Sequence, residues 1–245
     1  LITVSLVLNS NRYYVRPIFS KIKTKDSLFL GSSRLFFNEI ELITRGETKT
    51  RSKFLKVNDI KYLEPDIQRN INKKISNITK KRKKLGKFDF ERPLVMGILN
   101  VTPDSFFDGG KYLLRDNAIE QFKKLVKEGA DIIDIGGEST RPGSKEIRVN
   151  EEISRIIPII SQIRKKYKKE FISVDTRKSQ VMKEVCKFDI NLINDVSGLR
   201  FDKNSKKFLN SNKIPFVLMH SISTPEKMQK TIKYKDVLLD VYDFF

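Results

Sequence analysis

The chain of 245 residues contains a single cysteine, Cys186, and a single histidine, His220. One cysteine excludes an internal disulfide and is typical of a reducing compartment, so we expect a cytoplasmic protein. Apolar runs all stay short of the roughly 18 residues that a membrane-spanning helix needs, and we expect no membrane partner. The segment from Leu1 to Leu8 lacks the basic leader and cleavage site of a secretory signal. No repeat of the solenoid type is present.

Positive charge is in excess, because 49 Lys and Arg face 30 Asp and Glu, a net charge of +19. Residues 1–92 hold 22 Lys and Arg against 9 Asp and Glu, or +13, and residues 93–245 hold 27 against 21, or +6. The steepest run is Thr79 to Lys87. It predicts either a solvated helix end or linker, or a contact with nucleic acid or another anionic surface. Few aromatic residues interleave with these lysines, so nucleic acid is the less favoured partner.

Residues 1–90 predict a small, basic α+β extension. Three segments are typical of strands separated by polar turns, and a fourth is typical of a polar helix with one stripe of isoleucines. We expect the strands at Tyr13–Ile18, Ser33–Ile43 and Phe54–Val57, and the helix at Asp66–Lys84. The stripe consists of Ile67, Ile71, Ile75 and Ile78.

Residues 91–245 follow a different pattern, in which five short apolar segments each lead into a polar loop. Near-continuous apolar runs predict strands that are buried on both faces, as in parallel sheets. Polar side chains at the carboxyl ends of such strands are the usual way in which α/β enzymes build their sites. The five segments are Leu94–Leu99, Ile132–Gly136, Phe171–Asp175, Leu192–Asp195 and Pro215–Met219.

Helical patterns lie between these strands, which indicates parallel strands joined by right-handed crossovers. The first helix is expected from an N-cap at Asp116 to a stop at Gly129, and Pro158 interrupts the second. Five units fit an open doubly wound sheet or part of a closed barrel. The glycine-rich turn of a dinucleotide fold is absent after the first strand. Polar residues at all five strand ends favour a partial (β/α)8 TIM barrel over residues 91–245.

Five motifs make the pattern specific. Met96–Phe106 is MGILNVTPDSF and Asp134–Gly143 is DIGGESTRPG, and they are followed by SVDT, INDV and LMH. In this order the motifs resemble dihydropteroate synthase, over about residues 92–245. The resemblance implies a transferase of folate biosynthesis that condenses a dihydropterin pyrophosphate with p-aminobenzoate. It also implies a barrel fold, Mg2+ as cofactor, and a homodimer when the protein is complete.

The resemblance assigns roles to residues at the strand ends. Asp175 and Asn194 would bind the pterin, since a carboxylate and an amide suit its amidine-like edge in a dry pocket. Met219 would form a soft apolar wall. Asn100 matches the position associated with magnesium, and Thr140 matches a substrate contact.

The two loops after the first and second strands carry the remaining assignments. By resemblance, Phe106 and Pro142 flank the aminobenzoate, and Asp108 and Arg141 bridge the two loops. Asp104 lies where it can influence the same region. The Thr-Pro and Arg-Pro pairs limit backbone freedom, which lowers the ordering cost of a lid that excludes water.

Each of these residues also has a structural interpretation. Asp175 and Asp195 could cap loops or form salt bridges, and Asn100 and Thr140 could simply end strands. The sole histidine, His220, could be a general base, although histidines at strand ends are often only hydrogen-bonded. Cys186 is expected in the core.

Two other functions stay open on the sequence alone, namely a pterin-binding methyltransferase barrel and a non-enzymatic, basic nucleic-acid-binding protein. Members of the resembled family continue beyond the point that matches Phe245, with Asp-Pro-Gly, Ser-Arg-Lys and Arg-x-His segments. The stretch Ser221–Ser223 also replaces a commonly glycine-containing one. We therefore expect the 245-residue chain alone to be inactive and prone to aggregate, because five strands leave two open sheet edges.

Overall fold

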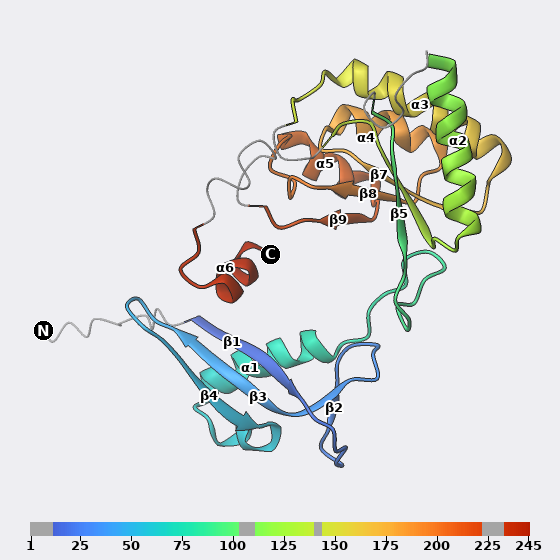
Figure 1. The fold of residues 1–245 in the computed structure, drawn as a ribbon. Coiled ribbons are helices and arrows are strands. Elements are labelled where there is room, and N and C mark those ends of the chain that lie inside the picture. The colour runs from blue at the N-terminus through green and yellow to red at the C-terminus, as the bar shows by residue number, and fades with distance from the viewer. Residues whose placement is uncertain (1–11, 103–110, 140–143, 222–232) are drawn as a thin grey trace, which may run out of the picture. The chain divides into compact units, whose positions relative to one another are not determined.

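A computed structural model of the chain describes residues 12–102, 111–139, 144–221 and 233–245. The chain divides into two compact units, Leu1–Arg92 and Pro93–Phe245. Figure 1 shows the strands and helices of both units. Among the described residues, no helix combines the length and the apolar composition of a membrane span.

The first unit is an antiparallel sheet covered by one helix. Its central strand β3 (Phe36–Arg45) pairs with β1 (Arg12–Phe19), β2 (Leu28–Phe29) and β4 (Thr50–Lys56). A 3-10 helix, η1 (Val57–Tyr62), leads to α1 (Pro65–Thr79). The predicted isoleucine stripe packs α1 on the sheet, and the buried core consists of Val15, Phe37, Ile40, Leu42, Ile60, Ile71 and Ile75.

Helix α1 ends five residues before the predicted end at Lys84. Lys80 already has an extended backbone, with φ −60° and ψ 130°. After Ile78 no apolar residue continues the stripe until Leu85, so further turns would bury nothing. They would also place like charges four residues apart, which destabilises a helix.

The second unit is a parallel sheet of five strands. The strands are β5 (Met96–Asn100), β6 (Ile132–Gly136), β7 (Phe171–Asp175), β8 (Leu192–Asp195) and β9 (Phe216–Leu218). Their order in space is their order in the chain, and all four pairings are parallel. A doubly wound sheet reverses its strand order at a switch point. This sheet has no reversal, so the predicted α/β class and barrel-type arrangement are confirmed.

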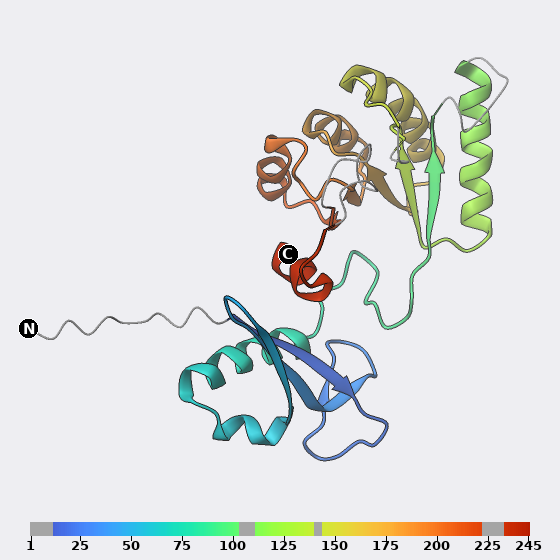
Figure 2. The same ribbon diagram turned by 60° about the vertical axis from the view of Figure 1, so that its left-hand side comes forward.

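Helices alternate with these strands and cover one side of the sheet (Figure 2). They are α2 (Lys111–Lys127), α3 (Val149–Lys166), α4 (Ser179–Val185), the 3-10 helix η3 (Cys186–Phe188) and α5 (Lys203–Asn212). The last helix, α6 (Val237–Phe244), contributes none of the described residues that form the core under this helix layer. Helix α3 is continuous through Pro158. Helix α2 begins before Asp116, so the predicted N-cap there was wrong. No helix breaker separates Lys111 from Asp116, and the intervening leucines favour a helix.

The strand register sorts the side chains of the sheet into two faces. Leu99, Ile135, Val174 and Ile193 occupy paired positions, are at most 1% exposed, and belong to the core that packs against the helices. Because side chains alternate along a strand, the residues next to them point to the opposite face. That second face includes the carboxyl ends of the strands and carries the polar residues described below.

Candidate functional site

Four paired positions form a row across the sheet. Asn100 pairs with Gly136, Gly136 pairs with Asp175, and Asp175 pairs with Asn194. A Cβ atom added to Gly136 would lie 3.5 Å from Asn100 Oδ1 and 3.5 Å from Asp175 Cβ. The side chains of Asn100 and Asp175 therefore flank the position that the glycine leaves open. The structure thus places three predicted site residues, Asn100, Asp175 and Asn194, in one row.

A second polar layer lies two residues deeper along the same face. Asp134 pairs with Ser173, and the Asn194 Nδ2 donates a hydrogen bond of 2.9 Å to Asp134 Oδ2. Asp134 is 5% exposed, and its Oδ1 has no hydrogen-bond partner among the described residues. A buried carboxylate oxygen of this kind calls for an explanation, such as a bound ligand.

Burial raises the pKa of both carboxyl groups on this face, Asp175 and Asp134. Burial raises the pKa of Asp175 well above its ordinary value, and the negative charges of Asp134, Glu152, Asp195 and Glu138 raise it further. Burial also raises the pKa of Asp134, although the Ser173 and Asn194 side chains oppose that rise. A carboxyl whose pKa is raised in this way holds a proton more readily, so it can donate as well as accept a hydrogen bond.

A buried ion-pair network lies behind the strand ends. Arg177 Nε donates to Glu138 Oε2 at 2.9 Å, and Lys178 Nζ donates to Glu138 Oε1 at 2.8 Å and to Glu152 Oε2 at 2.7 Å. Glu138 Oε1 also accepts the Ile147 backbone N–H at 3.0 Å. Burial acts to raise the pKa of Glu138, but these hydrogen bonds and the charge of Lys178 outweigh it and hold the pKa below its ordinary value. The network joins the loop after β6 to the loop after β7.

Phe201 and Asp202 connect the loop after β8 to the same network. The guanidinium carbon of Arg177 lies 3.9 Å from the centre of the Phe201 ring, a cation–π contact. Asp202 caps α5, since its Oδ1 accepts the Asn204 N–H at 2.9 Å, and its Oδ2 accepts the Ser179 N–H at 2.8 Å. Three consecutive loops are therefore tied together at the carboxyl ends of the strands.

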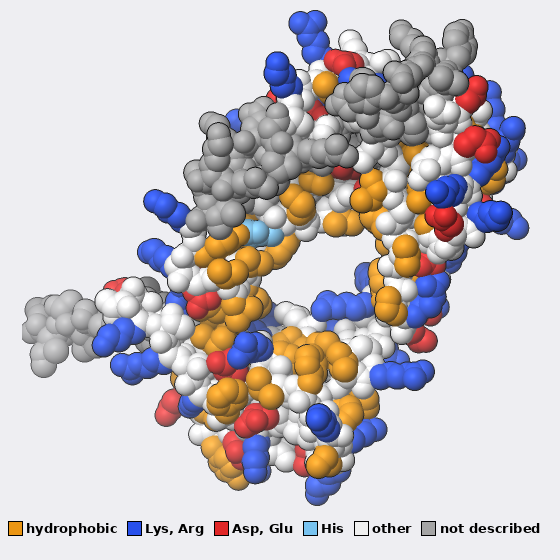
Figure 3. Space-filling model, in the orientation of Figure 1, with side chains coloured by type: hydrophobic (Ala, Val, Ile, Leu, Met, Phe, Trp, Pro, Cys, Tyr) orange, Lys and Arg blue, Asp and Glu red, His pale blue; other side chains and the backbone are white. Residues whose placement is uncertain are grey.

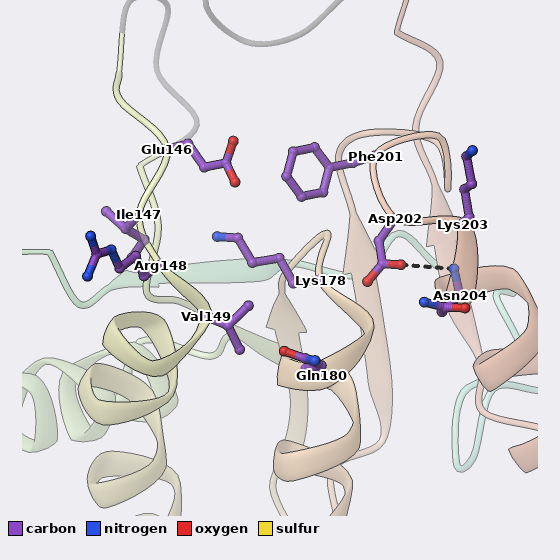
Figure 4. Close-up of a pocket in the computed structure, with 10 residues that line it drawn as sticks. All are labelled: Glu146, Ile147, Arg148, Val149, Lys178, Gln180, Phe201, Asp202, Lys203 and Asn204. Carbon is purple, nitrogen blue, oxygen red and sulfur yellow. Dashed lines mark hydrogen bonds between the residues drawn. The ribbon is translucent and has the colours of Figure 1, made fainter.

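A cavity of about 600 Å³ opens between these loops. In the close-up, Glu146 and Phe201 face each other across it, and the Lys178 side chain lies below them (Figure 4). It is lined by Glu146, Ile147, Arg148, Val149, Lys178, Gln180, Phe201, Asp202, Lys203 and Asn204. None of the row residues lines it, so this cavity is distinct from the polar face of the sheet.

Two other predicted residues, Met219 and His220, lie at the carboxyl end of the last strand. Met219 follows β9 directly, and its carbonyl oxygen lies close to Gly198, 2.7 Å from where a Cβ would be. The His220 ring packs edge-on against Phe244 at 4.7 Å between ring centres. Asp104, Phe106, Asp108, Thr140, Arg141 and Pro142 lie outside the described residues.

The structural interpretation holds for two residues. Asp195 is fully buried, and its Oδ1 accepts hydrogen bonds from the Ser197 backbone and hydroxyl, so it caps the turn after β8. Cys186 is half-buried and packs against the core. Burial raises the pKa of its thiol to about 11, which makes the thiol unreactive near neutral pH.

Sequence reasoning missed Asp134, Glu138, Arg177 and Lys178 as members of the site and its support. A signal for Asp134 was present, because it is the one charged residue in the apolar strand Ile132–Gly136. A charge at such a position is expected to have a specific partner or role. For the other three residues the ion pairs span about 26 to 40 positions in sequence, and no local pattern predicts them.

Comparisons with known proteins bear on this site. A sequence model of the family described as pterin binding enzyme matches residues 96–245. Dihydropteroate synthase from Escherichia coli (strain K12) is 41% identical over 157 residues, covering 64% of this chain and 55% of that protein. The Bacillus subtilis (strain 168) enzyme is 46% identical over 151 residues, covering 62% and 50%. The chain thus spans about half the length of these relatives.

Solved structures agree with the sequence comparisons. The dihydropteroate synthase of Yersinia pestis, solved with a sulfonamide drug complex, has a TM-score of 0.57 and 40% identity, and the match covers 63% of this chain and 55% of that one. The enzyme of Xanthomonas albilineans, solved with 4-aminobenzoic acid, has a TM-score of 0.56 and 40% identity, with coverage of 62% and 53%. These relatives confirm the resemblance seen in the motifs, and the chain belongs to the family of pterin binding enzymes.

Proposed function

We propose that the protein to which this chain belongs is a dihydropteroate synthase, which joins p-aminobenzoate to a dihydropterin and releases pyrophosphate. The observation that carries the proposal is the polar row of Asn100, Asp175 and Asn194 above the buried Asp134, in a chain whose relatives are dihydropteroate synthases. A flat, polar heterocycle needs this combination of a dry floor and few, fixed hydrogen-bonding groups.

Asn194 and Asp175 are suited to hold the pterin edge. The Asn194 amide nitrogen is already engaged with Asp134, which leaves the amide oxygen as the free acceptor. Asp175 offers a carboxyl group at the paired position, and its raised pKa lets it share a proton with a basic ring nitrogen. Together the two residues would accept the amino and ring N–H donors of the pterin and fix its orientation.

Asn100 fits a role beside the pyrophosphate and its magnesium ion. Mg2+ prefers oxygen ligands and is often held by one or two protein groups together with substrate phosphates. Among the described residues, no cluster of three or more His, Cys, Asp or Glu could hold a metal on its own. The Asn100 amide oxygen, next to the open position at Gly136, would therefore act as a single protein ligand. When bound, the ion would neutralise the charge that develops on the departing pyrophosphate.

The reaction depends on the alignment of the two substrates and needs no covalent intermediate with the protein. The amine nitrogen of p-aminobenzoate forms a bond to the methylene carbon of the pterin as the bond from that carbon to pyrophosphate breaks. No residue of the chain is assigned as a nucleophile. By the resemblance, Phe106 and Pro142 would flank the aminobenzoate, Asp108 and Arg141 would bridge the loops, and Thr140 and Asp104 would contact or influence the substrates. Their task would be to align the amine and exclude water, which competes for the same carbon.

Calorimetry with a dihydropterin pyrophosphate and Mg2+ tests the proposal in the complete protein. Asp175→Asn should weaken binding by one to two orders of magnitude, about 1.5–3 kcal/mol, because it removes a charge-assisted hydrogen bond. The same change at the exposed Asp116 in α2 should leave binding unchanged. Unaltered binding by Asp175→Asn, or no dihydropteroate formed by the complete wild-type protein, would contradict the proposal.

A further inference from the structure

The proposed function makes no use of the first unit, which carries most of the excess positive charge. Two of its segments, residues 19–35 and 80–87, form a surface that we call the basic apolar end. The Gly31 N–H donates to the Ile78 carbonyl at 3.0 Å, and the Arg82 N–H donates to Ser32 Oγ at 3.1 Å, so the two segments lie side by side. Together they hold ten Lys and Arg and only one acidic residue, Asp26, a net charge of +9.

The same surface exposes large apolar side chains. Ile22 is 75% exposed, Phe19 and Leu35 are each 51% exposed, and Phe29 is 41% exposed. On the face drawn in Figure 3, the unit that holds β1–β4 carries hydrophobic side chains at its surface among many Lys and Arg side chains. Single exposed apolar residues are ordinary, but a group of them within one basic surface indicates an interaction site.

Asn38 fixes the most exposed of these side chains in its outward position. The Asn38 Nδ2 donates to the Ile22 carbonyl at 3.0 Å and to Ser20 Oγ at 3.3 Å. The Ile22 N–H donates to Ser20 Oγ at 3.2 Å. On the other side, Asn38 Oδ1 accepts the Ser27 hydroxyl at 2.5 Å. The loop between β1 and β2 is therefore ordered by hydrogen bonds to Asn38 of β3 and within the loop, which hold the backbone of Ile22 while its side chain is exposed between Lys21 and Lys23.

The chemistry of this surface fits a lipid interface better than a nucleic acid. Stacking on bases needs flat, open aromatic faces. Ile22 and Leu35 have none, and the Lys23 ammonium lies 4.8 Å from the centre of the Phe29 ring and occupies that face. Phe19 and Phe29 pair with Phe37 and Phe36, which are neighbours on β3, so the two rings lie on opposite faces of the sheet and form no shared stacking platform. Apolar side chains flanked by lysines suit a membrane surface, because the apolar groups enter the headgroup boundary while the cations remain among the anionic headgroups.

We propose that the basic apolar end binds the surface of membranes that contain anionic lipids, with Ile22 entering the interface and Lys21, Lys23 and Arg82 contacting the headgroups. Such contact is peripheral and needs no spanning segment. It rests only on the first unit, so its outcome is independent of the proposed synthase activity. The alternative partner, a single-stranded nucleic acid, is an outcome of the test.

The test is flotation of the full chain through a density gradient with vesicles of phosphatidylglycerol and phosphatidylcholine in equal amounts, compared with vesicles of phosphatidylcholine alone. Only lipid-bound protein rises in the gradient, so aggregated protein is not counted as bound. We expect binding to the anionic vesicles only. Ile22→Ser should weaken it about tenfold, since a largely exposed isoleucine loses its apolar burial. The pair Lys21→Glu and Lys23→Glu should weaken it at least tenfold, because two positive charges that face the anionic headgroups become negative.

Two matched controls separate this surface from general effects. The pair Arg51→Glu and Lys53→Glu makes the same change of charge on β4, where Arg51 lies opposite Thr44, about 23 Å along β3 from Phe37. Val237→Ser removes an aliphatic side chain that is 61% exposed in the other unit. Both should bind vesicles like the wild type. Lack of binding to anionic vesicles, binding that Ile22→Ser leaves unchanged, or retention of an oligouridine without vesicle binding would each overturn the proposal.

Discussion

Replacing Lys178 by Met should destabilise the unit of residues 93–245 by about 3–5 kcal/mol at neutral pH. Lys178 is 3% exposed and donates hydrogen bonds to Glu138 and Glu152. Glu152 is fully buried, and the only hydrogen bond to its side chain among the described residues comes from Lys178. Methionine has a similar length and no charge, so the variant isolates the cost of leaving a buried carboxylate without its cation.

Two further variants test this explanation. The double variant Lys178→Met with Glu152→Met should recover most of the lost stability, because an apolar pair of similar volume often replaces a buried ion pair at little cost. Glu138 keeps Arg177 and the Ile147 N–H in that variant. Lys187→Met is the matched control, since Lys187 and its partner Glu184 are 59% and 36% exposed, and it should cost less than about 1 kcal/mol.

The dependence on pH gives an independent check. The pKa of Glu138 is lowered in the folded state, so its contribution to stability is present above the unfolded pKa of about 4.3 and is lost as the pH falls through the lower folded value. The gap between wild type and Lys178→Met should therefore be largest near neutral pH and smaller in acid. Urea unfolding followed by far-ultraviolet circular dichroism measures it. A double variant no more stable than the single one would refute the reasoning.

Two other substitutions test the site and its frame. The pKa of Asp175 is raised, so the folded state binds a proton more readily than the unfolded state, and stability falls as the pH rises from the unfolded value of about 3.9 through the folded one. Asp175→Asn should therefore raise the free energy of unfolding at neutral pH and leave it unchanged in strong acid. Urea unfolding at both pH values measures this, and a variant less stable than the wild type at neutral pH would contradict burial as the cause. Gly198→Ala should cost about 1–3 kcal/mol, because φ is +64° there and the new Cβ would lie 2.7 Å from the Met219 carbonyl oxygen and 2.8 Å from Phe244 Cζ. A melting temperature equal to that of the wild type would contradict this.

The elements of the second unit were predictable because its sequence separates them clearly. The apolar runs at Ile132–Gly136, Phe171–Asp175 and Leu192–Asp195 are strands within the predicted bounds. Asn100, Asp175 and Asn194 could be predicted together, since the carboxyl ends of parallel strands meet at one edge of a sheet. Two helix ends were less predictable, because no breaker directly follows Thr79 and none lies between Lys111 and Asp116. Helix α1 ends at Thr79, where the apolar stripe stops and the run of like charges begins.

Contacts between distant segments could not be predicted in the same way. The pairing of Asn194 with Asp134 depends on two intervening pairings, since β8 meets β6 only across β7. A register shift of one residue in either pairing would separate the two side chains. Likewise, Glu138 meets Arg177 and Lys178 only once the loops after β6 and β7 are adjacent. The local sequence around Glu138, Arg177 and Lys178 does not indicate that they form ion pairs with one another.

The two faces of the sheet make the site and the fold separable by mutation. Leu99, Ile135, Val174 and Ile193 stabilise the sheet from the helix-covered face, whereas Asp134 and Asp175 lie on the other face with raised pKa values. Carboxyl groups with raised pKa values lower the free energy of unfolding at neutral pH. The stability of the sheet must therefore come from its apolar face. A register slip of one residue would exchange the faces, placing carboxylates against the helices. The apolar face therefore fixes the register that aligns the row, and substitutions within the row should alter ligand binding while the register of the sheet is kept.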